Sequence, residues 1–373
     1  MSPELLLDTP AELAAADPGG MLPAVASAAA QVREAATFCA EAGVEALSRD
    51  DRPRSVVVLG MGGSGIAGDV LAAVAGISCP VPVLSHKGHG LPTWVGAADL
   101  VIAVSSSGTT EETLSGLEEA VRRGCRLLVV AAAGSPAEAL ASRGRALFVP
   151  ASQGRQPRAS VFSLSTPLLI AGDALGLLSC SREDVEATAV LLEQLATRNR
   201  PDADTVLNPG KTLALSLSDR VPVIWGSSPL AGVAAYRFAC QLNENAKVPA
   251  TYGVLPEAGH NQIVAFDGPF VAGPRDIFAD PDEDDGRTGL HLVLLRDTEE
   301  HPAVARRALV SRDLARSRGV EVSELIAEGL SPFQRIASLV AVGDWASTYL
   351  ALAEGLDPTP VEAITELKAA VGR

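Results

Sequence analysis

The chain has 373 residues, of which 47% are apolar and only 4% aromatic, and this is enough to bury the cores of one large or two medium α/β domains. Its formal charge of −15 argues against nucleic acid or an acidic membrane surface as a partner, because both require a basic protein surface. The five cysteines are scattered without a CxxC pair, and the N-terminus carries acids where a secretory signal carries basic residues. We therefore expect a cytoplasmic protein with reduced thiols and no membrane span.

Helix-like and strand-like segments alternate along the first half of the chain. Residues 1–50 have apolar residues at helical spacing, which predicts an N-terminal helical extension with one long helix over 24–47. Short apolar runs then alternate with helix-like segments such as 111–123, and this alternation predicts a parallel, doubly wound sheet. The expected strands are 55–59, 81–84, 100–104, 127–130 and 146–149.

A second half repeats this order after a polar, charged stretch at 179–210. An apolar run at 221–225, a turn rich in glycine and serine, a helix over 233–244 and a strand over 290–295 follow one another as in the first half.

These patterns predict an α/β protein of two domains, each with a parallel doubly wound sheet flanked by helices. The expected boundaries are 51–190 for the first domain and 205–345 for the second, with a C-terminal helical tail at 346–373. The acidic segment 276–289 is expected to be a solvated loop within the second domain.

The segment 60–65 reads GMGGSG and directly follows the first expected strand. It matches the GxGxxG pattern of dinucleotide sites, but the end of the next strand has no acidic residue to bind a ribose. A purely structural tight turn is a second alternative. We favour a third, in which Gly63 lets the backbone approach an anionic ligand and Ser64 offers a hydroxyl at a helix N-terminus.

A second loop, SSSGTT at 105–110, carries five hydroxyl side chains and precedes an expected helix. The structural alternative is a helix cap, but one hydroxyl is enough for that. Ser105, Ser107 and Thr110, with the N–H groups of the helix start, can donate several hydrogen bonds to one phosphate, which is the role we predict. His86 and His89 lack a set of further ligands, so no metal site is expected.

Six motifs, taken in order, resemble one known family: GMGGSG, SSSGTTEET, QPRAS, NENAK, PEAGHN and DPTPVEAITELK. They are similar to the tandem sugar isomerase (SIS) domain family, which includes bifunctional phosphoglucose/phosphomannose isomerases, over roughly residues 55–373. The resemblance implies two SIS domains and an aldose–ketose isomerase that acts on glucose 6-phosphate and mannose 6-phosphate, with fructose 6-phosphate as the common ketose. It implies no metal and no cofactor. It also implies a homodimer in which His260 completes the active site of the partner subunit.

The resemblance also implies roles for individual residues. The phosphate binders would be Ser64, Ser105, Ser107 and Thr110. The catalytic groups would be Glu244 as the base that moves a proton between C1 and C2, His260 for ring opening, Lys368 at the ring oxygen and Arg158 beside the reacting sugar. The residue types suit the chemistry, because a carboxylate can remove and return a carbon-bound proton, imidazole can exchange a proton with a ring oxygen, and a guanidinium can stabilise an enediolate.

Each of these side chains also has an ordinary structural alternative: a solvated acid for Glu244, a loop histidine for His260 and an exposed helix lysine for Lys368. Two positions depart from the family pattern, since Gln262 stands where an acid commonly follows the His-Asn pair and Phe266 stands where a tryptophan is common. The first departure leaves open what orients His260. Two other functions are kept as alternatives, a non-catalytic sugar-phosphate sensor on the same fold and an amino-sugar-phosphate enzyme.

Overall fold

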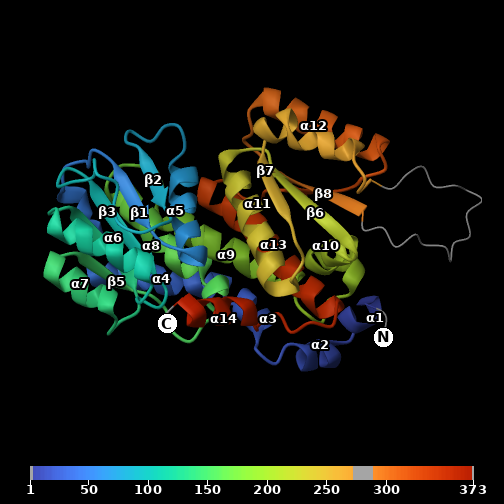
Figure 1. Cartoon of the computed structure of the whole chain (residues 1–373), viewed down its shortest axis with the longest axis horizontal. Helices are drawn as coiled ribbons and strands as arrows, with labels where there is room; N and C mark the ends of the chain where they lie inside the picture. The colour runs from blue at the N-terminus through green and yellow to red at the C-terminus, as the bar shows by residue number, and fades with distance from the viewer. Residues whose placement is uncertain (1–2, 272–288, 372–373) are drawn as a thin grey trace, which may run out of the picture. The chain divides into compact units, whose positions relative to one another are not determined.

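The computed structural model describes residues 3–271 and 289–371, which form two compact units. The first-sheet unit comprises Ser27–Gln194 and Gly329–Ala337, and the second-sheet unit comprises Met1–Ala26, Leu195–Glu328 and Ser338–Arg373. Each unit is built on one parallel sheet flanked by helices (Figure 1). The predicted fold class, α/β with two parallel sheets, is confirmed.

The first-sheet unit contains five parallel strands in the order β2-β1-β3-β4-β5. All five overlap the runs expected from the sequence. The strands are β1 (Val56–Leu59), β2 (Val83–His86), β3 (Leu100–Ser105), β4 (Arg126–Ala131) and β5 (Leu147–Pro150). The chain adds β2 on one side of β1 and β3 on the other, so the direction of winding reverses between β1 and β3.

The central strands β1, β3 and β4 are buried on both faces, which explains why they appear in the sequence as continuous apolar runs. Alternate residues such as Val57, Val101 and Val129 pack in one cluster with buried residues of α6 (Glu111–Arg122) and α7 (Pro136–Gly144). On the other face Gly68 of α5 (Gly62–Ala75) fits against Val58, since a Cβ built at Gly68 would lie 2.9 Å from the Val58 Cβ. Helix α8 (Val161–Ala174) packs against α5, and α4 (Ala28–Ala42) packs against α8.

The second-sheet unit contains four parallel strands in the order β7-β6-β8-β9. They are β6 (Arg220–Gly226), β7 (Thr251–Val254), β8 (Gly289–Arg296) and β9 (Glu321–Ile326), and the main helices are α10 (Pro209–Leu217), α11 (Pro229–Gln241), α12 (Pro302–Ser317), α13 (Pro332–Ala353, from Ser338 onward) and α14 (Glu362–Val371). This order repeats that of β2-β1-β3-β4, as the sequence repeat predicts. The expected strands 221–225 and 290–295 are β6 and β8.

The N-terminal 50 residues are helical, but they do not contain the single helix expected over 24–47. The chain forms α1 (Pro3–Leu7), α2 (Pro10–Ala16), α3 (Met21–Ala26), α4 and the 3₁₀ helix η1 (Val44–Arg49). Helix α4 ends because Gly43, at φ +74°, takes the left-handed conformation that terminates a helix. The two units share this segment, since 1–26 and 27–50 belong to different units. The domain boundaries 51–190, 205–345 and 346–373 stay a prediction.

Two further segments differ from expectation. The polar stretch 179–210 contains α9 (Arg182–Arg198), whose apolar residues Val185, Ala189 and Leu192 are buried. Residues 276–288 of the acidic segment lie outside the described residues, and Gly289 begins β8.

The expectation that no segment is long and apolar enough to span a membrane needs one correction. Helix α13 meets that test by length and composition, but 89% of its most apolar stretch is buried inside the protein. A core helix passes the same test, so α13 is weak evidence for a span.

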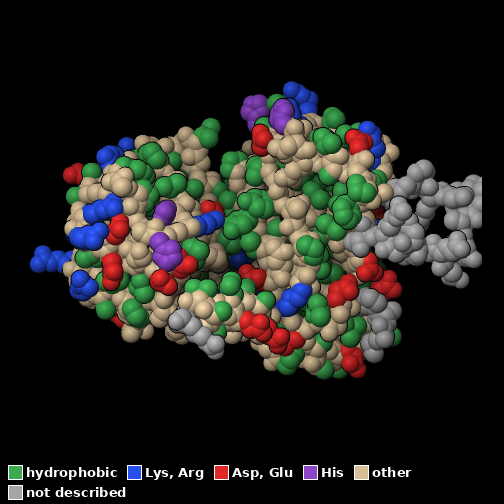
Figure 2. Space-filling model, in the orientation of Figure 1, with side chains coloured by type: hydrophobic (Ala, Val, Ile, Leu, Met, Phe, Trp, Pro, Cys, Tyr) green, Lys and Arg blue, Asp and Glu red, His purple; other side chains and the backbone are tan. Residues whose placement is uncertain are grey.

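On the face drawn in Figure 2, basic side chains occur in small separate groups among acidic ones.

Candidate functional site

The two loops predicted to bind phosphate begin at the carboxyl ends of neighbouring strands. Gly60 follows β1, and Ser105 is the last residue of β3. In sheets of this order, ligands bind outside the carboxyl ends of the strands where the winding direction reverses, which is between β1 and β3. The loops also contact each other, since the Ser106 N–H donates to the Ser64 Oγ at 3.3 Å.

The glycines of the first loop permit a tight path into α5. A Cβ at Gly60 would lie 2.9 Å from the backbone of Ser64, and Gly62 has a positive φ of +53°. The N-cap residue of α5 is Met61, whose side chain caps none of the N–H groups of the first turn. This helix N-terminus, with its partial positive charge, is therefore suited to an anion.

The second loop holds its hydroxyls in mutual hydrogen bonds. Ser105 Oγ accepts from the Gly108 N–H at 3.0 Å and lies 3.1 Å from Thr110 Oγ1, while Ser107 Oγ lies 2.9 Å from Thr109 Oγ1. Thr110 occupies the N-cap of α6, yet its side chain makes no capping hydrogen bond. The observed geometry thus gives the capping alternative no support at Thr110, and phosphate binding stays the prediction for these hydroxyls.

Arg158 lies beside the first loop. It is in the short helix η2 (Pro157–Ala159) and is 6% exposed, and its Cα is 3.8 Å from a Cβ built at Gly63. Gln31 anchors this segment by donating to the Ala159 carbonyl at 2.7 Å. The structure therefore brings Gly63, Ser64, Ser105, Ser107, Thr110 and Arg158 together in the first-sheet unit.

Lys87 is a basic residue at this edge that the sequence reasoning did not consider. It directly follows β2, its Cε lies 3.2 Å from a Cβ built at Gly65, and its Nζ forms an ion pair of 2.5 Å with Asp69. The signal was present in HKGHG, which was considered only for its histidines. Lys87 thus lies near the loop where an anion is expected, with its charge paired to Asp69.

Glu244 lies in an irregular segment of the second-sheet unit. Helix α11 continues into a π-helical turn, η4 (Leu242–Ala246), in which Glu244 is half-buried. Residues on either side fix this turn, because Gln241 donates to Asp344 at 3.1 Å and Asn245 donates to Ser347 Oγ at 3.1 Å. Short π-helical segments occur often at functional sites, which agrees with the role predicted for Glu244.

Lys247 fixes the end of the same turn. It has a left-handed φ of +59°, and its Nζ donates to the carbonyls of Glu244 at 2.8 Å, Asn245 at 3.2 Å and Pro360 at 2.9 Å. The ammonium therefore ties the backbone that carries Glu244 to the segment preceding α14.

The two remaining predicted residues are also in the second-sheet unit. His260 ends the 3₁₀ helix η5 (Glu257–His260), its side chain is exposed, and Arg307 Nη1 lies 3.0 Å from its Nε2. Lys368 is in the last turn of α14, a helix with no buried residues. The predicted site residues are thus divided between the two units, with Glu244, His260 and Lys368 in the second.

The corresponding edge of the second sheet differs from that of the first. Ser228 caps α11 by accepting from the Ala231 N–H at 3.1 Å, and its Oγ donates to Asp297 at 2.8 Å. A buried carboxylate here repels an anion, and the helix start is already capped. Within residues 3–271 and 289–371, the sequence repeat therefore extends to the fold but not to this loop, since the start of α11 is capped by a side chain and the start of α5 is not.

Comparison with known proteins gives the family. A family model described as the bacterial phospho-glucose isomerase C-terminal SIS domain matches residues 207–371. A bifunctional phosphoglucose/phosphomannose isomerase from Caldicellulosiruptor bescii is 34% identical over 314 residues, which cover 84% of this chain and 88% of the relative. The chain belongs to the bifunctional phosphoglucose/phosphomannose isomerase family.

One further relative agrees with this membership, and a solved structure agrees with the fold. The Aquifex aeolicus protein of the same name is 31% identical over 328 residues, covering 87% of this chain and 92% of the relative. A solved structure of a hypothetical protein from Thermus thermophilus has a TM-score of 0.70 at 18% identity, covering 98% of this chain and 94% of that one, which supports the fold. The family resemblance drawn from the six motifs is confirmed.

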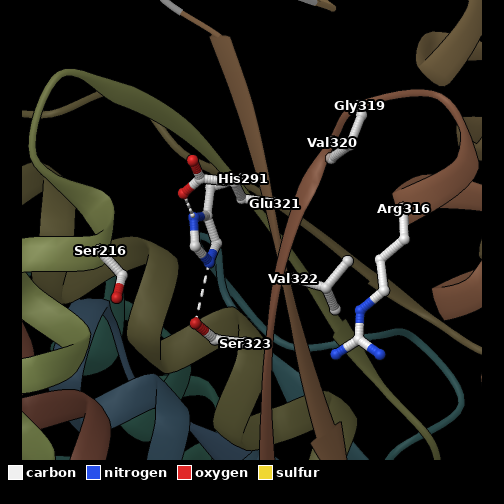
Figure 3. Close-up of a pocket in the computed structure, with 8 residues that line it drawn as sticks. All are labelled: Ser216, His291, Arg316, Gly319, Val320, Glu321, Val322 and Ser323. Carbon is white, nitrogen blue, oxygen red and sulfur yellow. Dashed lines mark hydrogen bonds and ion pairs between the residues drawn. The ribbon is translucent and has the colours of Figure 1, made fainter.

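A surface pocket in the second-sheet unit lies away from these residues, at the amino ends of β8 and β9. Figure 3 shows His291 between Glu321 and Ser323, with its Nε2 2.9 Å from Ser323 Oγ and its Nδ1 3.6 Å from Glu321. Burial lowers the pKa of His291, and the nearby Glu321 opposes this shift. None of the predicted site residues lines this pocket, so we interpret His291 as a buried histidine that bonds to its neighbouring strand.

Over 3–271 and 289–371, no group of three or more His, Cys, Asp and Glu side chains is placed to hold a metal ion. The absence of a metal stays a prediction.

Proposed function

We propose that this protein is an aldose–ketose isomerase that interconverts glucose 6-phosphate and mannose 6-phosphate with fructose 6-phosphate through a cis-enediol. The observation that carries the proposal is the meeting of two hydroxyl-bearing loops at the point of reversal between β1 and β3, where Ser64 contacts the second loop. The names of the family's members agree with this assignment.

The substrate phosphate would be bound by Ser64, Ser105, Ser107 and Thr110, with Gly63 allowing the backbone to approach. The uncapped N-termini of α5 and α6 would add favourable electrostatics. This arrangement needs no basic protein surface, so it is compatible with the net charge of −15.

Glu244 would remove the proton from C2 of the aldose and return it to C1, which gives the ketose once the hydroxyl proton has moved from O2 to O1. Arg158 would stabilise the enediolate, because its guanidinium stays protonated throughout. His260 would open the pyranose ring by proton exchange, and Lys368 would assist at the ring oxygen, O5. No redox cofactor is required for this sequence of steps.

The substitution Glu244→Gln tests the base directly. It should lower turnover by at least about 10²-fold while leaving substrate affinity largely intact, since general base catalysis contributes roughly 10² to 10⁴. The matched control is Glu118→Gln, an exposed acid on α6, which should behave as wild type. Unchanged turnover in Glu244→Gln would remove Glu244 from the mechanism.

We further propose a homodimer in which His260 acts in the partner's active site, since its side chain is exposed on its own protomer. Subunit mixing of two inactive variants, Glu244→Gln and His260→Asn, tests this arrangement. If His260 acts across the interface, each mixed dimer regains one intact site, and the mixture recovers about a quarter of the wild-type activity. If it acts within its own protomer, the mixture stays inactive.

We place the protein in the cytoplasm, where thiols are kept reduced. Burial raises the pKa of Cys39 and of Cys180 to about 12, so both thiols stay protonated and unreactive there.

A further inference from the structure

Gln262 lies two residues after His260, and its side chain bonds to the neighbouring strands. Its Oε1 accepts from the Trp225 indole N–H at 2.7 Å, and its Nε2 donates to the Tyr252 carbonyl at 3.0 Å. Both ends of the amide are therefore used in fixing the loop to β6 and β7. These contacts point the Gln262 amide at Trp225 and Tyr252, and the side chain of His260 contacts Arg307.

Arg307 makes that contact from a different element. It lies on α12, 47 residues along the chain, and its Nη1 is 3.0 Å from the His260 Nε2. A guanidinium has only donors, so Nε2 must be the acceptor. The hydrogen bond therefore selects the neutral tautomer of His260, with the proton on Nδ1 and the lone pair on Nε2.

The surroundings hold the arginine in this position. Arg307 is half-buried, and the next residue, Ala308, is fully buried against the core of the second-sheet unit. A Cβ at Gly259 would lie 3.2 Å from the Arg307 Cδ and 3.5 Å from its Nη1, so the glycine leaves room for the arginine to lie along the loop.

We propose that Arg307 is the positioning residue of His260, and that it presets Nε2 as the atom that accepts the O1 proton in ring opening. This inference rests on the proposed function. As the sugar binds, its O1–H replaces the Nη1–H as the donor to Nε2. The proton then moves to Nε2, the O1–H bonding electrons form the C1=O1 double bond, the C1–O5 bond breaks, and O5 takes a proton from the Lys368 ammonium. Solvent then removes the proton from His260 and returns one to Lys368.

Ring opening can be measured separately from isomerisation. Exchange NMR with glucose 6-phosphate reports enzyme-catalysed interconversion of its α and β anomers, which needs ring opening alone. Exchange of the C2 proton with D₂O reports the enediol step, which needs Glu244. The variant Glu244→Gln should therefore keep catalysed anomerisation while losing deuterium exchange.

The test variant is Arg307→Met, which keeps the aliphatic stem against Gly259 and removes the donors. We expect catalysed anomerisation to fall by about tenfold or more, because misplacing a catalytic group can cost up to about 10²-fold, while the KM for glucose 6-phosphate changes by less than about twofold. Arg307→Lys keeps one donor and should be intermediate. Arg306→Ala, an exposed neighbour on the same helix, is the matched control and should match wild type.

Three outcomes are distinguished. A selective loss of anomerisation in Arg307→Met, partly restored in Arg307→Lys, supports the inference. Wild-type anomerisation in Arg307→Met, with isomerase activity intact, overturns it and leaves the proposed function standing. A wild-type protein that catalyses neither anomerisation nor deuterium exchange overturns the proposed function itself.

Discussion

The hydroxyl loop after β3 gives a quantitative prediction for substrate affinity. Ser107 is exposed and Thr110 half-buried, and in the described part of the chain each hydroxyl bonds only to groups of the same loop. Replacing both by alanine therefore removes donors to an anion with little change to the fold. A hydrogen bond to a charged group contributes about 1.5 to 3 kcal/mol, and about 1.4 kcal/mol is a factor of ten.

The double variant Ser107→Ala with Thr110→Ala should consequently raise the KM for glucose 6-phosphate by at least about 10²-fold, allowing for water that replaces part of the lost bonding. Unphosphorylated fructose has no phosphate for these hydroxyls to bind. The slow enzyme-catalysed exchange of its carbon-bound protons with solvent should therefore be the same in the double variant and in wild type. The assay is steady-state isomerisation with both sugars, and Ser142→Ala, an exposed hydroxyl on α7, is the control. An unchanged KM for glucose 6-phosphate would refute the reasoning and leave the loop a helix start without a ligand role.

Two further predictions concern stability and metals. Hydrogen bonds from Arg54, and further ones from Gly96 and Ser55, hold the pKa of the buried Asp99 below its usual value. The ionised carboxylate therefore stabilises the fold above pH of about 4, and this contribution is lost as the pH falls through the lower, folded pKa. Urea midpoints measured across this range should fall less steeply with acid in Asp99→Asn than in wild type, and equal slopes would contradict the assignment. Treatment with EDTA should leave isomerase activity unchanged, whereas a loss that is restored by added metal would show that a metal takes part.

The sequence predicted the strands that are buried on both faces, because such strands appear as unbroken apolar runs. Strands β7 and β9 were not predicted, because their exposed or partly exposed side chains interrupt the apolar pattern. They are the two edges of the second sheet, and β9 alternates or exposes its side chains, as in EVSELI. Strand β7 has only four residues and exposes Thr251 and Tyr252.

The candidate site was only partly predictable, because some of its residues are close in the fold but not in the sequence. Hydroxyls and glycines clustered in one loop give a local signal, and so the phosphate residues could be named from the sequence. Lys87 and Arg307 contribute through proximity that the fold creates, from β2 and α12 respectively. The π-helical turn around Glu244 also leaves no periodic signal, since the pattern of α11 continues into it.

The most direct test of the central claim is proton NMR of the purified protein with fructose 6-phosphate in D₂O, which reports conversion and deuteration at C2 together. The proposed isomerase should produce glucose 6-phosphate and mannose 6-phosphate, each carrying deuterium at C2. Fructose 6-phosphate that binds but neither converts nor exchanges its protons would contradict the claim and favour a sugar-phosphate sensor on the same fold.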